Sequence, residues 1–308
     1  MDLNGNLNNK MELINLFNTD VKLKTHYCSF FGQKNEQVED PYINLYLRTK
    51  YCNAKCPFCT YHSDASKWNH KKYIEVLKEI SSKIKIRKIA FSGGEPTLFW
   101  ENFKNMVYTA KEYSPMSEFS INTDGFKIDR FFSDPIYKIF DFIHLSRHHY
   151  DDKINDTIFK TKTPTSDEIL EISKLQTHEH QFQFRCNLIK GFIDNKEEVF
   201  KYLDWSNSVG VNDIGLVSLM PINEYSKENF IYFHIKELIG DNFLLTKKQE
   251  RHGGGCECFN YIYMPNEESF RRPIRVYHKN TYAPTDIQET LVFDGENVRL
   301  GFEGPIIF

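Results

Sequence analysis

Three cysteines close together have the clearest capacity for chemistry in this sequence. They stand in Cys52-Asn53-Ala54-Lys55-Cys56-Pro57-Phe58-Cys59, a Cys-x-x-x-Cys-x-x-Cys pattern that follows a short apolar run. Thiolates are soft ligands that suit iron–sulfur clusters, zinc and Cu(I). Three of them can hold three irons of a [4Fe–4S] cube and leave the fourth iron open to a substrate or cofactor.

Zinc and unmetallated structural cysteines are the alternatives. A structural zinc site normally has four ligands in two close pairs. The nearest residues that could supply a fourth ligand are His62 and His70, at irregular spacing from the cysteines. From these residues alone, both alternatives remain open.

Size and composition indicate a globular protein without a membrane or nucleic-acid partner. The 308 residues can bury one large core, or one core with an appended lobe. Lysine and arginine total 39 against 42 aspartate and glutamate, so the net charge of −3 provides no basic surface for nucleic acid. The mean hydropathy is −0.53, and no segment approaches the roughly 20 apolar residues that span a bilayer. The polar start contains no signal-peptide core, so we expect a cytoplasmic protein.

Short apolar runs alternate with helical periodicity between residues 43 and 220. The expected strands are Ile43–Leu47, Lys88–Phe91, Glu118–Ile121, Phe142–Leu145, Gln181–Ile189 and Ile214–Met220. The expected helices are Lys71–Ile84, Trp100–Tyr113, Ser166–Leu175 and Asn195–Val209, the last ended by Gly210. Such alternation implies parallel pairing, and therefore a barrel or an open α/β sheet.

The two ends of the chain follow other patterns. The first 40 residues show only one amphipathic stretch, Met11 to Phe17. The strand–helix alternation stops near Pro221, and a loop-rich stretch follows. A hairpin is expected from Glu289 to Phe302, around Asp294-Gly295.

The cysteine loop resembles the cluster motif of the radical S-adenosylmethionine (radical SAM) superfamily, including the aromatic Phe58 before the last cysteine. The resemblance implies that Cys52, Cys56 and Cys59 hold one [4Fe–4S] cluster, and that the backbone beside Phe58 contacts the adenine of SAM. Fold and cofactors are implied with it: an α/β partial (β/α)6 TIM-like barrel that binds the cluster and SAM. In our division, residues 1–40 are an N-terminal extension, 41–221 the barrel and 222–308 a C-terminal α+β capping lobe.

A second segment strengthens the resemblance. Phe91-Ser92-Gly93-Gly94-Glu95-Pro96 resembles the GGEP segment of the superfamily, which follows the second strand and binds the methionine amino group of SAM. Gly93 and Gly94 allow close approach of the backbone, and Glu95 can accept from an ammonium. Taken alone, the segment would be a strand-ending turn.

The later strand ends carry further matches. Asn122-Thr123-Asp124-Gly125 resembles the end of the third strand of the superfamily, where side chains meet the SAM ribose; the alternative is an Asx turn. Ser146 resembles the polar residue of the fourth strand near the SAM carboxylate or ribose.

Two strands are closest to the molybdenum-cofactor GTP 3′,8-cyclase branch. Arg185-Cys186-Asn187 is similar to its fifth-strand Lys-x-Asn, and Met220-Pro221 to its sixth-strand Met-Pro, where the methionine packs on adenine. Arg185 would replace the lysine as carboxylate partner, since a guanidinium binds carboxylates bidentately. A structural ion pair is the other reading of Arg185.

The C-terminal part departs from that branch, which holds a second cluster through a Cys-x-x-Cys pair and a third cysteine. Here the pair is Cys256-Glu257-Cys258, and Gly301 stands at the place of the third cysteine. We therefore expect one cluster only. Cys256 and Cys258 are interpreted as thiols, one of them a candidate hydrogen donor to the substrate.

The segment after the fourth strand is a candidate substrate contact, because barrel sites lie at that end of the strands. It contains His148, His149, Tyr150 and Asp151. The alternative is a solvated loop with helix-capping residues.

The resemblance implies reductive cleavage of SAM to a 5′-deoxyadenosyl radical that abstracts hydrogen from a substrate. An external one-electron reductant of flavodoxin or ferredoxin type would be the partner. The short N-terminal extension and sparse later cysteines favour a small-molecule substrate, a nucleotide or natural-product intermediate. The alternatives are a peptide-modifying maturase, a GTP 3′,8-cyclase-like activity, and a non-catalytic Fe–S or zinc-binding protein.

Overall fold

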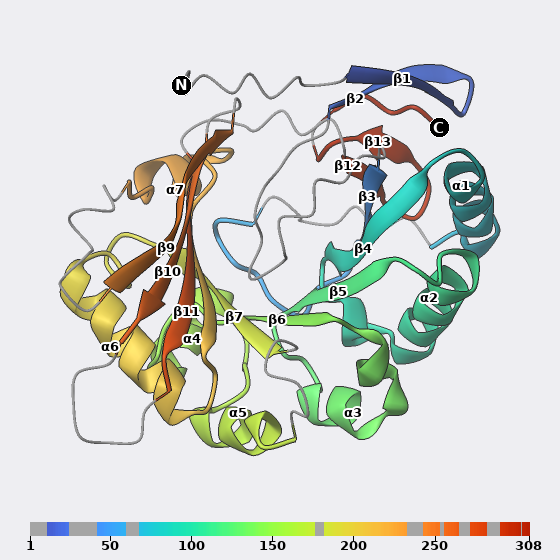
Figure 1. Ribbon diagram of the computed structural model, residues 1–308. Coiled ribbons are helices and arrows are strands. Elements are labelled where there is room, and N and C mark those ends of the chain that lie inside the picture. The colour runs from blue at the N-terminus through green and yellow to red at the C-terminus, as the bar shows by residue number, and fades with distance from the viewer. Residues whose placement is uncertain are drawn as a thin grey trace, which may run out of the picture.

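A curved, mostly parallel sheet with helices along its outer side organises the chain (Figure 1). The computed structural model describes residues 11–24, 42–59, 68–175, 182–232, 243–252, 256–264, 272–281, 290–302 and 304–308. Six strands pair in parallel in chain order: β3 (Tyr42–Thr49), β4 (Lys85–Gly93), β5 (Glu118–Thr123), β6 (Phe142–Ser146), β7 (Phe182–Leu188) and β8 (Asp213–Ser218). Their carboxyl ends therefore lie along one edge of the sheet.

Helices connect these strands and cover the outer face of the sheet (Figure 1). They are α1 (His70–Lys83), α2 (Trp100–Tyr113), α3 (Ile128–Ser133), α4 (Asp152–Phe159), α5 (Ser166–Ser173) and α6 (Lys196–Ser208), with 3₁₀ turns η1 (Pro96–Leu98) and η2 (Pro135–Ile139). Helix α1 shows why they form. Asn69 caps its N-terminus by accepting from Lys72 N, and Tyr73, Val76, Leu77 and Ile80 bury one face at helical spacing.

The C-terminal half extends the sheet at both edges. The elements are α7 (Glu224–Glu228), β9 (Phe243–His252), β10 (Cys256–Tyr263), β11 (Ile274–Thr281), β12 (Thr290–Phe293) and β13 (Val298–Leu300). Strand β11 pairs in parallel with β8, and β12 pairs in parallel with β3. The described residues thus form one sheet of eleven strands, and a separate hairpin of β1 (Met11–Leu16) and β2 (Thr19–Lys24).

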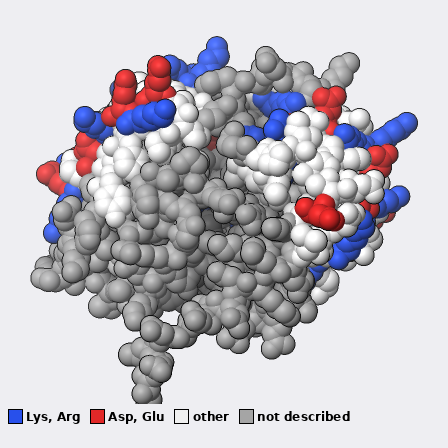
Figure 2. All heavy atoms as spheres, turned by 90° about the horizontal axis from the view of Figure 1, so that it is seen from above, with Lys and Arg blue, Asp and Glu red and all other residues white. Residues whose placement is uncertain are grey.

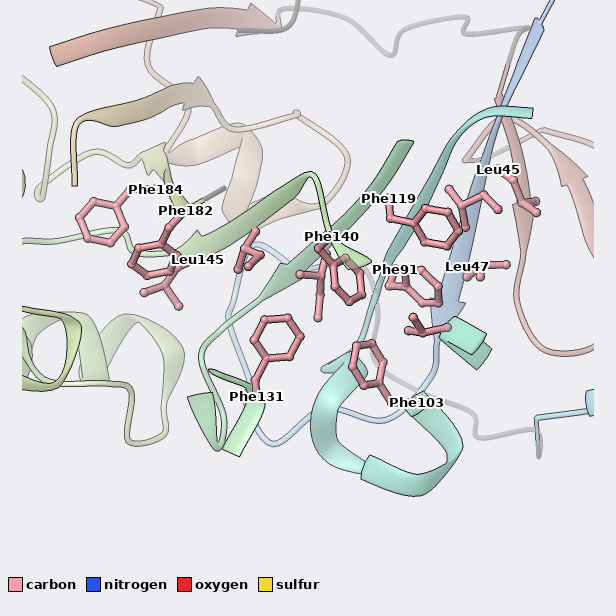
Figure 3. Close-up of a cluster of buried hydrophobic side chains, with 14 of the residues drawn as sticks. Leu45, Leu47, Phe91, Phe103, Phe119, Phe131, Phe140, Leu145, Phe182 and Phe184 are labelled. Carbon is pink, nitrogen blue, oxygen red and sulfur yellow. The ribbon is translucent and has the colours of Figure 1, made fainter. Parts of the chain in front are cut away.

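The core lies between the sheet and the helices. Phe91 and Phe119 project from neighbouring strands toward Phe103 of α2 and Phe140, and the aromatic cluster continues to Phe182 and Phe184 (Figure 3). Phe103 and Phe140 stack with ring centroids 6.0 Å apart. Burying each such ring stabilises the fold by roughly 1.5–3 kcal/mol, so this cluster fixes the barrel strands against α2 and α3.

The fold class predicted from the sequence is confirmed, and most elements of the barrel fall where the periodicity placed them. Helix α2 has the predicted bounds, Gly210 adopts φ +79° just after α6, and the predicted hairpin is β12–β13. One expectation was wrong: the stretch after Pro221 contains strands β9 to β11 where a loop-rich segment was expected. The amphipathic stretch from Met11, for which no element was predicted, belongs to the β1–β2 hairpin. Strands from before and after residue 221 belong to one sheet. The division of the chain into domains at residues 40 and 221 therefore remains a prediction.

Charges of both signs are mixed on the surface. In the view of Figure 2, Lys and Arg side chains of the described residues alternate with Asp and Glu. No helix among the described residues is long and apolar enough to span a membrane.

Candidate functional site

The cysteine loop follows β3 at the carboxyl edge of the sheet. Cys52 is exposed, Cys59 half-buried and Cys56 buried. A turn closes the loop, since Cys59 N donates to Cys56 O over 3.0 Å, and Ala54 N donates to Cys52 Sγ over 3.3 Å. Backbone donors to sulfur are a feature of iron–sulfur sites, so this part of the loop fits a cluster ligand.

The loop thiols are protonated unless a cation binds them. Desolvation, reinforced by Asp124 and Glu95, raises the pKa of Cys52 to about 12. Desolvation and the neighbouring thiols likewise raise the pKa of Cys56. A bound metal reverses this balance by stabilising thiolates.

The geometry of the described residues bears on the choice between zinc and a cluster. No three His, Cys, Asp or Glu side chains of that set converge on a single ion position. His62 lies outside the described residues, and His70 is an exposed residue that begins α1. Three thiolates are the donor set of a [4Fe–4S] cluster with one open iron, so the residues present fit that group by their chemistry.

The glycines of the GGEP segment lie directly against the cysteine loop. Gly93 has φ +100°, and Gly94 N donates to Thr49 O over 2.5 Å. Glu95 N donates to Tyr51 O over 2.7 Å. A Cβ on Gly94 would stand 2.0 Å from Tyr51 O, so only glycine permits this contact. The two motifs found separately in the sequence thus lie side by side, because the GGEP segment binds the residue that precedes Cys52.

We expect Gly94→Ala to destabilise the protein by roughly 2–4 kcal/mol, because the new methyl group must push the cysteine loop away from β4. Urea unfolding measures this. Gly191→Ala is the matched control: Gly191 has φ +85° but open space around it, so only backbone strain of about 1 kcal/mol is expected. Equal losses in the two variants would contradict the proposed contact.

Glu95 is surrounded by protein donors. Its side chain is 2% exposed, and its carboxylate accepts from Thr97 N (2.9 Å), Thr97 Oγ1 (2.6 Å), Thr123 Oγ1 (2.9 Å) and Asp124 N (2.8 Å). Burial, and then the nearby Asp124, raise the pKa of Glu95 well above its ordinary value. Glu95 therefore ties η1 to the end of β5. If Glu95 also bound the amino group of SAM, as predicted, that group would have to share the carboxylate oxygens with these protein donors.

The end of β5 forms the Asx turn considered from the sequence. Asp124 Oδ1 accepts from Phe126 N over 2.9 Å, and Thr123 Oγ1 accepts from Gly125 N over 2.9 Å. Asn122 Oδ1 and His144 Nδ1 are 2.9 Å apart. Ser146 is half-buried and lies opposite Arg185 in the β6–β7 register. The structure thus brings Asn122, Thr123, Asp124 and Ser146 to the same edge as the cysteine loop, and ribose contact stays a prediction.

Polar side chains line the inner face of the sheet. Arg185 Nη2 lies 3.0 Å from His144 Nε2 and donates to Gln183 Oε1 over 3.1 Å. Its side chain crosses Gly215, where a Cβ would come within 2.5 Å of Nη1. Desolvation lowers the pKa of Arg185 to about 10, which leaves it charged. Met220, two residues beyond β8, is half-buried.

Lys88 is an inner-face cation that the sequence analysis missed. It is half-buried on β4, and desolvation followed by repulsion from Arg185 lowers its pKa to about 8, while Glu118 acts in the opposite direction. The alternation of side chains along the strand could have revealed it. Successive side chains point to opposite faces, and Ile89 faces the core, so Lys88 and Ala90 point to the other face.

The residues after β6 make hydrogen bonds within their own segment, to α4 and to α6. Asp151 caps α4 by accepting from Ile154 N, His149 Nδ1 accepts from Asp151 N, and Tyr150 Oη donates to Glu198 over 2.9 Å. Buried Arg147 donates to the carbonyls of His149 and Pro164, both over 2.7 Å. These contacts support the capping alternative for His149, Tyr150 and Asp151.

His148 lies beside the cysteine loop instead. Its ring stacks on Phe159 with centroids 4.8 Å apart and meets Phe58 edge-on at 5.2 Å. Nδ1 accepts from Asn187 N over 3.1 Å, which places the proton of the neutral ring on Nε2. Burial, and then Arg147, lower the pKa of His148 to about 3.

This shift predicts a loss of stability in acid. Below the ordinary pKa of 6.5 the unfolded chain binds a proton that the folded His148 refuses, so stability falls as pH decreases toward 3. For His148 alone we expect the free energy of unfolding to decrease by about 2 kcal/mol between about pH 7 and pH 5. Urea unfolding at both pH values measures it. His148→Asn, whose Oδ1 can accept from Asn187 N, should lose that part of the slope; an unchanged slope would contradict the assignment.

Cys256 and Cys258 lie on β10, where Cys256 is opposite Thr281 of β11 and His252 of β9. Their side chains are outside the described residues, so the predicted hydrogen-donor role stays a prediction. Toward the other end of β11, Arg275, opposite Ile262 of β10, pairs with Asp213 of β8 at 2.5 Å.

Fold and strand-end site together define a barrel-type α/β protein with a three-cysteine metal motif. The sequence matches the family model of the radical SAM superfamily over residues 46–206, just over half of the chain, and the chain therefore belongs to that superfamily. The superfamily uses a [4Fe–4S] cluster and SAM, and membership indicates an enzyme.

Several known proteins are similar. A "Probable GTP 3',8-cyclase" of Saccharolobus islandicus (strain L.S.2.15) is 28% identical over 195 residues, 60% of this chain and 58% of that protein. A Sulfolobus acidocaldarius protein of the same description is 24% identical over 207 residues, 65% and 61% of the two chains. The chain thus spans less than two thirds of these relatives.

Streptococcus suis SuiB bound to S-adenosylmethionine aligns with TM-score 0.49 and 16% identity over 64% of this chain and 45% of SuiB. The structure of anSMEcpe with bound AdoMet and Cp18Cys peptide aligns with TM-score 0.49 and 17% identity over 60% and 55%.

Proposed function

We propose that this protein is a radical SAM enzyme that acts on a small molecule carrying an anionic group. The observation that carries the proposal is that the GGEP segment binds the residues leading into the cysteine loop, through Gly94 N–Thr49 O and Glu95 N–Tyr51 O. Tyr51 is next to Cys52, so this contact supports a site at the carboxyl edge in which the loop would hold the cluster and the glycines would contact SAM. When bound, the cluster and SAM supply a 5′-deoxyadenosyl radical that removes a hydrogen atom from the substrate.

The residues of the chain divide the remaining work. Cys52, Cys56 and Cys59 would hold the cluster, and Phe58, Gly93 and Gly94 would contact SAM. Glu95, with Thr97 and Asp124 N, keeps the strand ends in register. Asn122 of β5, Ser146 of β6, Arg185 of β7 and Met220 after β8 would contact SAM from neighbouring strands. An external one-electron reductant of flavodoxin or ferredoxin type would supply the electron.

The inner face of the sheet supports the substrate class. Lys88 Nζ lies 5.3 Å from the centroid of the Phe142 ring on β6, and Arg185 Nη2 lies 3.0 Å from His144 Nε2 on the same strand; both cations are half-buried. Two cations on one partly accessible face attract a carboxylate or phosphate. Nucleotides and acidic natural-product intermediates carry such groups. A peptide substrate is the competing outcome.

Anaerobic reconstitution tests the reaction class. Protein supplied with iron, sulfide, SAM and dithionite should hold about four irons per chain and form 5′-deoxyadenosine; stoichiometric zinc without product would refute the proposal. The substrate class is tested by adding low-molecular-weight metabolites or peptides from cells. Metabolite acids should stimulate 5′-deoxyadenosine formation, and stimulation by the peptide fraction alone would favour a maturase. Formation of 3′,8-cyclised GTP would identify the cyclase reaction.

A further inference from the structure

Helix α7 holds the outer side of the cysteine loop. Asn223 Nδ2 donates to Pro57 O over 3.2 Å, and Ser226 Oγ donates to Phe58 O over 3.4 Å. The partners are 166 and 168 residues apart in sequence, so this contact exists only in the folded chain. Pro57 and Phe58 stand between two of the thiols, and their carbonyl positions therefore fix the path from Cys56 to Cys59.

A single amide makes two of these connections. While Asn223 Nδ2 binds the loop, its Oδ1 accepts from Ser226 N over 2.7 Å and caps α7. Aspartate caps helices as well as asparagine does, but it has no donor for a carbonyl. The loop contact thus requires the amide, whereas the cap requires only the oxygen.

Other contacts seat the same part of the loop. Lys55 N donates to Phe159 O at the end of α4 over 2.9 Å. The Phe58 ring packs against the buried cluster of Ile158, Ile189 and Leu219. Leu219 precedes Met220 on the segment that leads from β8 into α7. Asn223 and Ser226 therefore add side-chain hydrogen bonds to a contact that otherwise consists of the Phe58 ring packing and one backbone hydrogen bond.

We propose that Asn223 is a positioning residue that locks the cysteine loop to α7 and to the end of β8. The inference rests on the proposed function only in that the loop holds a cluster. When one iron–thiolate bond opens, a rigid loop keeps the thiol in place so that the bond can form again. The cluster is therefore retained. Ser226 supports Asn223 through the longer bond to Phe58 O.

Asn223→Asp tests this, since it keeps the cap and places an oxygen against Pro57 O. Asn69→Asp is the control: Asn69 caps α1 by accepting from Lys72 N over 3.1 Å, and within the described residues its side chain makes no hydrogen bond to the loop. In reconstituted protein, Asn223→Asp should release iron to a chelator about tenfold faster, which corresponds to the loss of one partly buried hydrogen bond. The electron paramagnetic resonance spectrum of its reduced cluster should also change. Asn69→Asp should match the wild type in both.

A second measurement needs no cluster. In the apoprotein, alkylation of buried Cys56 should be slow relative to exposed Cys52. Asn223→Asp should accelerate it about tenfold, and Ser226→Ala less. Wild-type rates of both iron release and Cys56 alkylation in Asn223→Asp would overturn the proposal. Failure of the proposed function would instead show as wild-type protein that forms no 5′-deoxyadenosine, and the alkylation result would stand on its own.

Discussion

Replacing Cys52, Cys56 or Cys59 by serine is expected to reduce 5′-deoxyadenosine formation to the rate without protein. Each thiolate binds a different iron of a cubane, and an alcohol does not replace a thiolate at neutral pH. Each single variant should therefore lose most of its iron, and the cluster absorbance with it. Iron analysis after anaerobic reconstitution and product chromatography measure the two effects.

Cys186→Ser is the matched control for these variants. Cys186 is buried on β7 and belongs to the hydrophobic core instead of the carboxyl edge. It should retain about four irons per chain and SAM cleavage, with only a loss of stability. If one of the three loop variants kept the full iron content, that cysteine would not be a cluster ligand.

The elements of the barrel were predictable because their signals are local. Helix α1 repeats apolar residues at Tyr73, Val76, Leu77 and Ile80, and the strands carry short buried runs. Helix α4 was missed because its eight residues contain few apolar side chains, and its cap Asp151 is equally common in turns. Strand β11 was missed because it pairs with β8, far away in sequence, and β10 and β9 add to the sheet only through β11. Sequence periodicity contains no information about such partners.

The site was predictable to the extent that it is formed by contiguous motifs. The three cysteines and Gly93-Gly94-Glu95 could be found by spacing, and the structure brings them together. Their supports could not be found in this way. Asn223 and Ser226 contact the loop only through the fold, and Lys88 looks like an ordinary strand lysine until Arg185 is placed beside it. Polar residues that act through distant partners leave no local pattern.

Glu95→Ala is expected to be among the most destabilising substitutions in the chain. It removes the shared acceptor of Thr97 N, Thr123 Oγ1 and Asp124 N in a site that is 2% exposed, while Thr97 Oγ1 keeps the carbonyl of Phe126 as an acceptor at 2.8 Å. Each buried donor without an acceptor costs about 1–3 kcal/mol. Burial of the wild-type carboxyl itself costs free energy, as its raised pKa indicates. The alanine variant no longer bears this cost, which offsets part of the loss. We therefore expect a loss of roughly 3–4 kcal/mol in urea unfolding.

Glu95→Gln separates hydrogen bonding from charge. The glutamine carbonyl can keep the donors at one oxygen, Oε1, which include both groups of Thr97. Its amide nitrogen replaces the oxygen that accepts from Asp124 N, but it can donate to the neighbouring Asp124 carboxylate. We expect a loss of about 1 kcal/mol, with Glu101→Gln on the exposed surface of α2 as a neutral control. A glutamine variant as unstable as the alanine variant would mean that the negative charge, and not the shared acceptor, holds the ends of β4 and β5 together.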